Sequence, residues 1–495
     1  MLSDHWKKPF LVYVLLLSGL LTACSDSGSS DDEDDEDSAQ NPIIGAFNAV
    51  PDLDKITLFT SDDDEEYSWG TLSYGSSVTS STSKGTLGVR AEVILPTDDT
   101  TACAGDADEN GVKDDDECTE IASTSIAVAN DTDYLVALYG NYGNIQFLQY
   151  SKPLHVFDTE DEDEDGDAED ENLEIWFFHL AQGLGKVDVY LEAPGTNLSP
   201  VQVKGTLSRK GSFDGLVDEG DYVITLTEVG NPENVLFISD SFTLSAQTRV
   251  GFAIRDGAGE GTSPVKVTLF RDQNKTLINR NATTELRFAH AVPEGEDIDV
   301  YIDDEFEQTF VTGLAFEKNS AYREISKSQL TNLSVDVTPT ANPGVYLARK
   351  ELDLAQGDRS TYYFVGKSYD WNGVKLTENV RRLATHAKLR LINGSTASYD
   401  YYLVDGDENI SSLYADETLD YRENSGWVTY NPGTYNLVVA LDGTDTVVYS
   451  ANIQLEANGI YNLVTTINAA DPNAADVVFF DDFASSETGA EAQVE

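Results

Sequence analysis

The sequence predicts an all-β protein, a tandem array of four Ig-like β-sandwich domains that follows a leader and a disordered acidic tether. Short runs rich in Val, Ile, Thr and Tyr alternate at period two, and Gly, Asn, Asp or Pro interrupts them every eight to twelve residues. A similar opening segment occurs four times, about 100 residues apart, which is the size of an Ig-like sandwich of about seven strands. Beyond the leader, we find no amphipathic helical pattern.

The first residues are typical of a bacterial lipoprotein signal peptide. Lys7 and Lys8 precede an apolar run from Phe10 to Leu21 that is too short to span a bilayer, and small residues then lead to Cys24. In lipoproteins this cysteine is acylated, and several acyl chains together give stable anchoring. We therefore expect Cys24 to anchor the chain in the outer membrane, on a face that the sequence leaves open. The alternative is an ordinary secretory leader with a chance cysteine.

The net charge of the chain is strongly negative. Eighty-eight Asp and Glu residues stand against 31 Lys and Arg, which gives a formal net charge of -57. Such a surface repels phosphate backbones, so nucleic acid is excluded as an expected partner, whereas divalent cations are favoured. Adaptation to a salty medium is the alternative explanation. Acidic runs such as Asp31–Asp37 are typical of solvated spacers, and we expect a disordered tether over 24–42.

Each repeat opens with an apolar strand that ends in Asn or His and is followed by a loop and a second alternating strand. The residues at this position are Asn48, His179, His290 and Asn393, and we call them the marker residues. Their recurrence indicates a structural role, such as a side chain that bonds the adjacent loop. A metal-binding or catalytic role would need partner residues that the pattern does not supply.

The repeats and the segments between them predict the domain boundaries. These are a signal peptide 1–23, a tether 24–42, a first sandwich 43–153, an acidic linker 154–172, a second sandwich 173–272, a linker 273–283, a third sandwich 284–383, a fourth sandwich 384–484 and a tail 485–495. We expect each sandwich to have a core of its own, so that the units follow one another like beads on a string.

The opening segment resembles a bacterial repeat family known as domain of unknown function 4397, whose units begin with a pattern like hxHAxPxxxxVDVYxD. The third opener, with His290 to Pro293 and Asp299 to Asp303, matches this pattern well. The second lacks the Pro, the first has Thr57 where Asp is expected, and the fourth diverges most. The resemblance covers nearly all of the chain after the leader. It implies a secreted β-sandwich array and brings no agreed activity.

The segment from Asp106 to Glu117 fits the calcium-loop pattern D-x-[DN]-x-[DN]-G-x5-E. Calcium prefers six to eight hard oxygen ligands and is the expected structural cofactor. The expected ligands are Asp106, Asp108, Asn110, the Val112 carbonyl, Asp114 and Glu117. The flanks are not helical, so the loop is similar to the isolated calcium loops of thrombospondin type-3 repeats or dockerins. A solvated acidic loop is the alternative.

Two cysteines bracket this acidic loop. If Cys24 is acylated, Cys103 and Cys118 remain as a pair, and export to an oxidising compartment makes a disulfide the default. A bridge across a loop of this length would stabilise the fold by about 3 kcal/mol. It would also clamp the calcium loop in place of the helices of an EF-hand.

The fourth repeat is the richest in aromatic residues. Two uses are open for such side chains: they stack on sugars, or, more commonly, they fill the faces of strands. The residues concerned are Tyr399, Tyr401, Tyr402, Tyr414, Tyr421, Trp427 and Tyr430.

These features together predict a non-catalytic, lipid-anchored protein of the cell envelope that acts as a binding, adhesion or spacer array. No G-x-S-x-G, H-E-x-x-H or activated-cysteine motif is present in the sequence. The expected partners are the membrane, through Cys24, and a protein or glycan ligand that the sequence does not identify. The alternatives are a polysaccharide-acting enzyme or accessory module, and a calcium-dependent stalk without a specific ligand.

Overall fold

The computed structural model describes residues 40–62, 65–96, 118–157, 172–303, 308–367, 370–404, 410–471 and 474–482. All of them belong to one structural unit, Gln40–Glu495. Cys24, the expected tether before residue 40, Cys103, the predicted calcium loop and most of the expected acidic linker lie outside the described residues.

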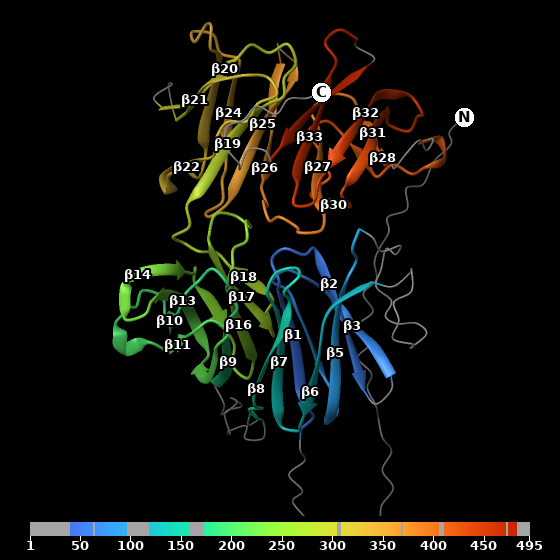
Figure 1. Cartoon of the computed structure of the whole chain (residues 1–495). Helices are drawn as coiled ribbons and strands as arrows, with labels where there is room; N and C mark the ends of the chain where they lie inside the picture. Colours follow the sequence, from blue (N-terminus) through green and yellow to red (C-terminus); the bar gives the residue numbers. More distant parts are fainter. Residues whose placement is uncertain are drawn as a thin grey trace, which may run out of the picture. The chain divides into compact units, whose positions relative to one another are not determined.

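The first repeat forms a sandwich of two four-stranded sheets (Figure 1). Its strands are β1 (Ile43–Ala49), β2 (Lys55–Asp62), β3 (Glu65–Ser73), β4 (Ser77–Ser81), β5 (Gly85–Val93), β6 (Thr119–Val128), β7 (Thr132–Tyr139) and β8 (Gln146–Pro153). One sheet has the order β4-β1-β7-β8, and we call this sheet and its equivalents the pairing sheets. The other has the order β3-β2-β5-β6, and we call this sheet and its equivalents the outer sheets.

The second repeat has the same plan with two added strands. Its elements are β9 (Asn172–His179), β10 (Val187–Glu192), the 3-10 helix η1 (Pro200–Gln202), β11 (Gly205–Leu207), β12 (Ser212–Asp218), β13 (Gly220–Glu228), β14 (Asn231–Ile238), β15 (Phe242–Leu244), β16 (Arg249–Asp256), β17 (Val265–Arg271) and β18 (Lys275–Leu277). The pairing sheet is β12-β9-β16-β17-β18, and the outer sheet is β11-β10-β13-β14 with β15 also on β13. The stretch 273–283, expected as a linker, therefore contains a strand of this sheet.

The third repeat returns to eight strands. Its elements are β19 (Thr284–His290), β20 (Ile298–Ile302), β21 (Gln308–Leu314), β22 (Arg323–Ile325), the 3-10 helix η3 (Lys327–Gln329), β23 (Leu333–Pro339), β24 (Ala348–Leu352), β25 (Arg359–Lys367) and β26 (Asp370–Thr377). The pairing sheet is β22-β19-β25-β26 and the outer sheet is β21-β20-β23-β24.

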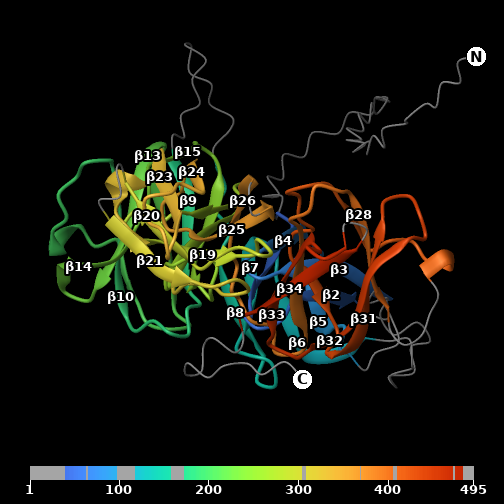
Figure 2. The same ribbon diagram turned by 90° about the horizontal axis from the view of Figure 1, so that it is seen from above.

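The fourth repeat follows the same order, and Figure 2 shows it from above. Its elements are β27 (Ala387–Asn393), β28 (Tyr399–Val404), the 3-10 helix η4 (Ile410–Ser412), β29 (Glu417–Leu419), β30 (Val428–Tyr430), β31 (Gly433–Leu441), β32 (Val447–Leu455), β33 (Ile460–Ile467) and β34 (Ala475–Asp481). The pairing sheet is β30-β27-β33-β34 and the outer sheet is β29-β28-β31-β32. The prediction of an all-β chain of tandem β-sandwiches is confirmed, with at least eight strands in each sandwich where about seven were expected.

A parallel strand pair lies at the centre of every pairing sheet. The first strand of each repeat runs parallel to the strand that opens its final hairpin, as β1 does to β7, β9 to β16, β19 to β25 and β27 to β33. Parallel strands are usually buried on both faces and are therefore apolar along their whole length. The pair in this protein follows that rule, since six of the seven residues of β1 and seven of the eight residues of β7 are buried.

One face of the parallel pair packs against the outer sheet of the same repeat. In the second repeat, Phe177 of β9 stacks on Phe252 of β16 with ring centroids 4.3 Å apart, inside a core that also contains residues of β10, β13 and β14. Burial of each such side chain stabilises the fold by about 1.5–3 kcal/mol. In the strands of the outer sheet every second side chain points inward, and these side chains form the opposite half of the core.

The other face of the parallel pair packs against a neighbouring repeat. Phe47 of β1 and Phe178 of β9 belong to one cluster of buried side chains that joins the pairing sheets of the first and second repeats. A second cluster, with Ala289 of β19 and Ile392 of β27, joins those of the third and fourth repeats. The repeats are therefore fused in pairs, and the expectation of independent beads on a string is wrong.

Buried ion pairs accompany both joints, as Lys152 with Glu174 and Arg271 with Asp133 do between the first and second repeats. The guanidinium of Arg287 on β19 donates two hydrogen bonds, of 2.6 and 2.7 Å, to the carboxylate of Asp482 after β34. At the equivalent position of the fourth repeat, Arg390 on β27 donates a 2.6 Å hydrogen bond to Glu378 after β26. The two ion pairs cross the joint in opposite directions, which gives the third and fourth repeats a two-fold pattern of contacts.

The joint between the first two repeats predicts a large effect of Phe178→Ala. The side chain is fully buried, and its ring centroid lies 5.0 Å from that of Tyr150 in the first repeat. We expect the change to lower the free energy of unfolding by about 3–5 kcal/mol in urea denaturation, because it leaves a cavity. Leu216→Ala, at a residue 49 % exposed on the neighbouring β12, is the control and should change it by about 0.5 kcal/mol or less. Equal small effects would mean that the repeats do not share this core.

Candidate functional site

The two asparagine markers hold the loop that follows the first strand. Asn48 donates from Nδ2 to the carbonyl of Leu72 at 3.1 Å, and Asn393 donates to the carbonyl of Leu419 at 2.9 Å. Each side-chain oxygen also accepts the amide N–H of the residue two positions further on, at 2.9 Å. Because both side chains are fully buried, their polar atoms serve the fold and are closed to a ligand.

The two histidine markers make equivalent contacts. Nε2 of His179 lies 2.7 Å from the carbonyl of Gly185, and Nε2 of His290 lies 3.2 Å from the carbonyl of Glu296. Nδ1 of His290 accepts the amide N–H of Val292 at 3.2 Å, so this ring is neutral and Nε2 carries the proton. Burial lowers the pKa of both imidazoles, that of His290 to about 4.

The low pKa of His290 predicts a loss of stability in acid. The unfolded imidazole has a pKa near 6.5 and the folded one about 4, so its contribution is complete above pH 6.5 and is lost as the pH falls towards 4. The difference between the folded and unfolded pKa of this imidazole corresponds to about 3 kcal/mol of unfolding free energy.

His290→Asn supplies the comparison, because Asn occupies the marker position of two other repeats and keeps a donor and an acceptor. We expect the variant to lose less unfolding free energy than the parent between pH 7 and pH 4.5 in urea titrations. Parallel pH profiles for the two chains would contradict the neutral, buried imidazole.

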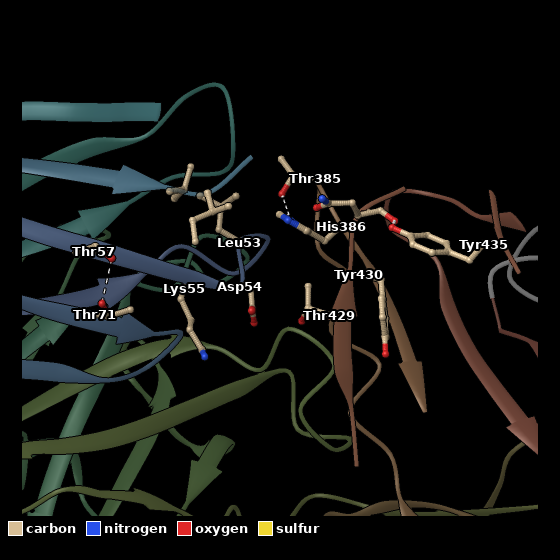
Figure 3. Close-up of a pocket in the computed structure, with 13 residues that line it drawn as sticks. Leu53, Asp54, Lys55, Thr57, Thr71, Thr385, His386, Thr429, Tyr430 and Tyr435 are labelled. Carbon is tan, nitrogen blue, oxygen red and sulfur yellow. Dashed lines mark hydrogen bonds between the residues drawn. The ribbon is translucent and has the colours of Figure 1, made fainter. Parts of the chain in front are cut away.

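A cleft of 690 Å³ opens between the first and fourth repeats (Figure 3). The wall formed by the first repeat comes from the outer sheet and the loop before it, with Leu53, Asp54, Lys55, Thr57, Thr71 and Ile94. The wall formed by the fourth repeat comes from β30, β31 and the segment before β27, with Thr385, His386, Thr429, Tyr430, Asn431 and Tyr435. Side chains of both walls point towards the space between them (Figure 3).

Arg381 connects the two walls. Its Nη1 donates to the carbonyls of Pro51 and Leu53, at 3.0 and 2.7 Å, and its guanidinium lies over the ring of Tyr74, 5.6 Å from the centroid. Three residues along the chain, the amide of Ala384 donates to the carbonyl of Asp52 at 2.7 Å. The loop at the first-repeat wall is therefore tied to the segment that leads into the fourth repeat, and Arg381 positions the cleft.

The hydroxyl and ring groups of the cleft are held by short-range contacts. The hydroxyls of Thr57 and Thr71 lie 3.0 Å apart on adjacent strands, as Figure 3 shows. Across the cleft, the rings of Tyr430 and Tyr435 meet edge to face with centroids 6.0 Å apart. The hydroxyl of Tyr435 donates to the carbonyl of Asn431 at 2.9 Å, which fixes its ring.

The charges of the cleft balance. Within the described part of the chain, neither Asp54 nor Lys55 forms an ion pair, so the carboxylate and the ammonium are both available to a ligand. His386 lies beside Thr385, with Nδ1 2.7 Å from the hydroxyl, and burial lowers the pKa of its imidazole. It is therefore neutral at pH 7, and the formal charges of Asp54 and Lys55 cancel.

The remaining site residues predicted from the sequence are only partly described. Cys118 is 4 % exposed and disulfide-bonded, while Cys103 lies outside the described residues, so their pairing stays a prediction. Cys24 and the six calcium ligands also lie outside them. Among the residues that the structure does describe, no group of three or more His, Cys, Asp or Glu side chains could hold a metal ion, and no helix is long and apolar enough to cross a membrane.

Sequence reasoning missed the cleft and the residues that build it. Its walls lie about 330 positions apart in the chain, as the hydrogen bonds from Arg381 to Pro51 and Leu53 show. Tyr430 was noted only as one of several aromatic residues in the fourth repeat. A usable signal existed for the joints. The opening strand of the second repeat has consecutive apolar residues from Ile175 to Phe178, whereas a strand with one solvent-exposed face would alternate apolar and polar residues.

The fold and the cleft define an all-β protein of tandem, pairwise-fused β-sandwiches with a polar cleft. Residues 284–400 match the model of the family described as domain of unknown function (DUF4397). The match covers the third repeat and the first strand of the fourth and ends within β28. The family resemblance drawn from the openers is confirmed over this range.

Solved structures show only distant similarity. The Bacillus anthracis TIE protein is 10 % identical, with 83 % of this chain and 68 % of that chain covered and a TM-score of 0.14. A family CBM26 module of Eubacterium rectale Amy13K, solved with maltoheptaose, is 14 % identical over 39 % of this chain and 95 % of that chain, with a TM-score of 0.15. The pilus adhesin SpaC of Lactobacillus rhamnosus GG is 8 % identical over 86 % of this chain and 56 % of that chain, with a TM-score of 0.14.

Similarities at these scores carry no argument about function. No curated protein matches the sequence.

Proposed function

We propose that the protein is a non-catalytic, lipid-anchored binding protein of the cell envelope that holds its ligand in the cleft between the first and fourth repeats. The cleft is the observation that carries this proposal. It combines ring faces, hydroxyl groups and two available charges in a space of 690 Å³, within the usual range of ligand pockets of about 300–1,000 Å³. Adhesion is the use that fits a binding site carried on an anchored chain.

One composite site replaces the multivalent array expected from the repetition. The marker side chains are fully buried, and the pairing sheets are covered by neighbouring repeats. The features that repeat most clearly are therefore occupied in building the protein. The cleft, in contrast, needs residues from two different repeats and occurs where the first meets the fourth.

Retention of envelope material tests the binding role. The purified full chain, immobilised on a sensor surface, should bind solubilised envelope material saturably and release it chemically unchanged. Thr71→Trp, which places a large ring at an exposed cleft position on β3, should abolish retention, while Tyr414→Ala, at a tyrosine 99 % exposed outside the cleft, should not. Release of new reducing ends from envelope polysaccharide would support the enzymatic alternative and contradict a non-catalytic role.

Acylation of Cys24 is the proposed anchor. Cys24→Ala should abolish incorporation of labelled palmitate and move the chain from the membrane fraction to the soluble fraction, because the thiol is the acyl acceptor. Ser25→Ala, one position further on, leaves the thiol in place and serves as the control. A Cys24→Ala chain that still carries palmitate would show that the anchor lies elsewhere.

Protease treatment of intact cells then decides the face of the outer membrane. Cleavage in intact cells, with a periplasmic control protein protected, fits a surface-exposed binding protein. Protection until the outer membrane is opened fits a periplasmic one.

We also propose that the segment from Asp106 to Glu117 binds calcium. Support comes from the full match to the loop pattern and from the strongly acidic chain around it. Asp106→Ala should remove one uptake site in calorimetric titration, with an affinity in the weak extracellular range of about 10⁻⁴–10⁻³ M. Asp163→Ala removes one carboxylate from the acidic linker and serves as the matched control, because it should leave the calcium site intact. Unchanged uptake in Asp106→Ala would rule the loop out.

A further inference from the structure

We infer that the cleft takes a neutral carbohydrate, bound through its hydroxyl groups and with one sugar face on the tyrosine wall. This inference deepens the proposed binding function, on which it rests, by naming the chemical class of the ligand.

The groups of the cleft match a ligand whose hydroxyls both donate and accept hydrogen bonds. Asp54 offers a carboxylate that only accepts, and Lys55 offers an ammonium that only donates. Adjacent hydroxyls of a sugar can use both at once, with one donating to the carboxylate and the next accepting from the ammonium. The hydroxyls of Thr71, which is exposed, and Thr429, which is half-buried, add groups that can donate or accept.

The ring wall supplies the apolar part of the recognition. Sugars present faces of C–H groups that pack on aromatic rings, and Tyr430 and Tyr435 both line the cleft. Because Tyr435 is fixed by its hydrogen bond to Asn431, and its ring meets that of Tyr430 edge to face, the wall is formed before a ligand arrives. A preformed ring wall reduces the entropy lost on binding.

The electrostatics favour a neutral ligand. The chain has a formal net charge of -57, which repels polyanions such as acidic polysaccharides or nucleic acids. Among the residues that line the cleft, the formal charges of Asp54 and Lys55 cancel and His386 is held neutral, so the lining itself carries no net charge that would select an ionic ligand. The Arg381 guanidinium is already bonded to the carbonyls of Pro51 and Leu53.

The first-repeat wall is poorly suited to an extended peptide. A peptide that adds to a sheet needs free backbone N–H and C=O groups. The wall presents the face of the outer sheet, where Thr57 of β2 is paired with Thr71 of β3 on one side and with Glu92 of β5 on the other. At Thr57 the backbone is therefore paired on both sides, and only its side chain is offered to the cleft.

Calorimetric titration of the purified full chain with a panel of neutral hexasaccharides tests the inference. The panel consists of cellohexaose, laminarihexaose, maltohexaose, mannohexaose and chitohexaose. An alginate hexamer and an uncharged hexapeptide serve as the acidic and peptide probes. We expect at least one neutral sugar to bind and the other two probes to fail. Asp54→Ala should weaken that binding about tenfold or more, because the carboxylate is lost as an acceptor, and Thr71→Trp should abolish it.

Matched changes outside the cleft control for general damage. Asp442→Ala removes one exposed carboxylate from the turn after β31, and Tyr414→Ala removes one exposed ring, so both should bind the sugar as the parent does. Binding of alginate or the peptide in place of a neutral sugar would overturn the carbohydrate class. Failure of the whole neutral panel would overturn it too, as would sugar binding that Asp54→Ala and Thr71→Trp leave unchanged.

The proposed function and this inference fail differently. If Thr71→Trp abolishes retention of envelope material but no neutral sugar binds, the cleft is a binding site for another class of ligand. If envelope material is retained equally by the parent and Thr71→Trp, the cleft itself is not the site.

Discussion

The structure depends on burial of the central parallel strand pair on both of its faces. One face forms the core of its own sandwich, and the other forms the joint with the next repeat. A parallel pair with one face in water would expose large side chains such as Trp176 and Phe178. Pairwise fusion is therefore a consequence of the strand order that all four repeats share, and it makes two adjacent repeats a single stable body.

Some of the few cations of this acidic chain are buried where repeats meet. Six Lys or Arg residues are buried among the described ones, namely Lys152, Arg255, Arg287, Arg381, Lys388 and Arg390. Several of them bond carboxylates or carbonyls of another repeat, as Arg287 does with Asp482 and Arg381 with Leu53. Cations placed at the joints offset the repulsion between acidic repeats, and their removal from the surface leaves the exterior still more negative.

The same arrangement creates the cleft. Because the pairing sheets pack against each other at the joints, the outer sheets and the segments between repeats form the accessible surface. Arg381 lies in such a segment and holds the loop of Pro51 and Leu53 against the start of the fourth repeat. A cleft made from two distant repeats follows from this contact, and it is the composite site that we propose for the ligand.

The sequence by itself determined the strand-rich architecture, the fourfold repeat and the family resemblance, because period-two alternation, turn residues and the opener motif are local patterns. It also pointed to the fold role of His290 and Asn393, since both recur at the end of the same strand. Only the tertiary structure decided that the repeats fuse in pairs and that Asp54 faces Tyr430 across a cleft. Many of those contacts join residues far apart in the chain, as Phe47 and Phe270 or Arg381 and Leu53 do. Their partners are selected by packing and charge in three dimensions, which no local pattern records.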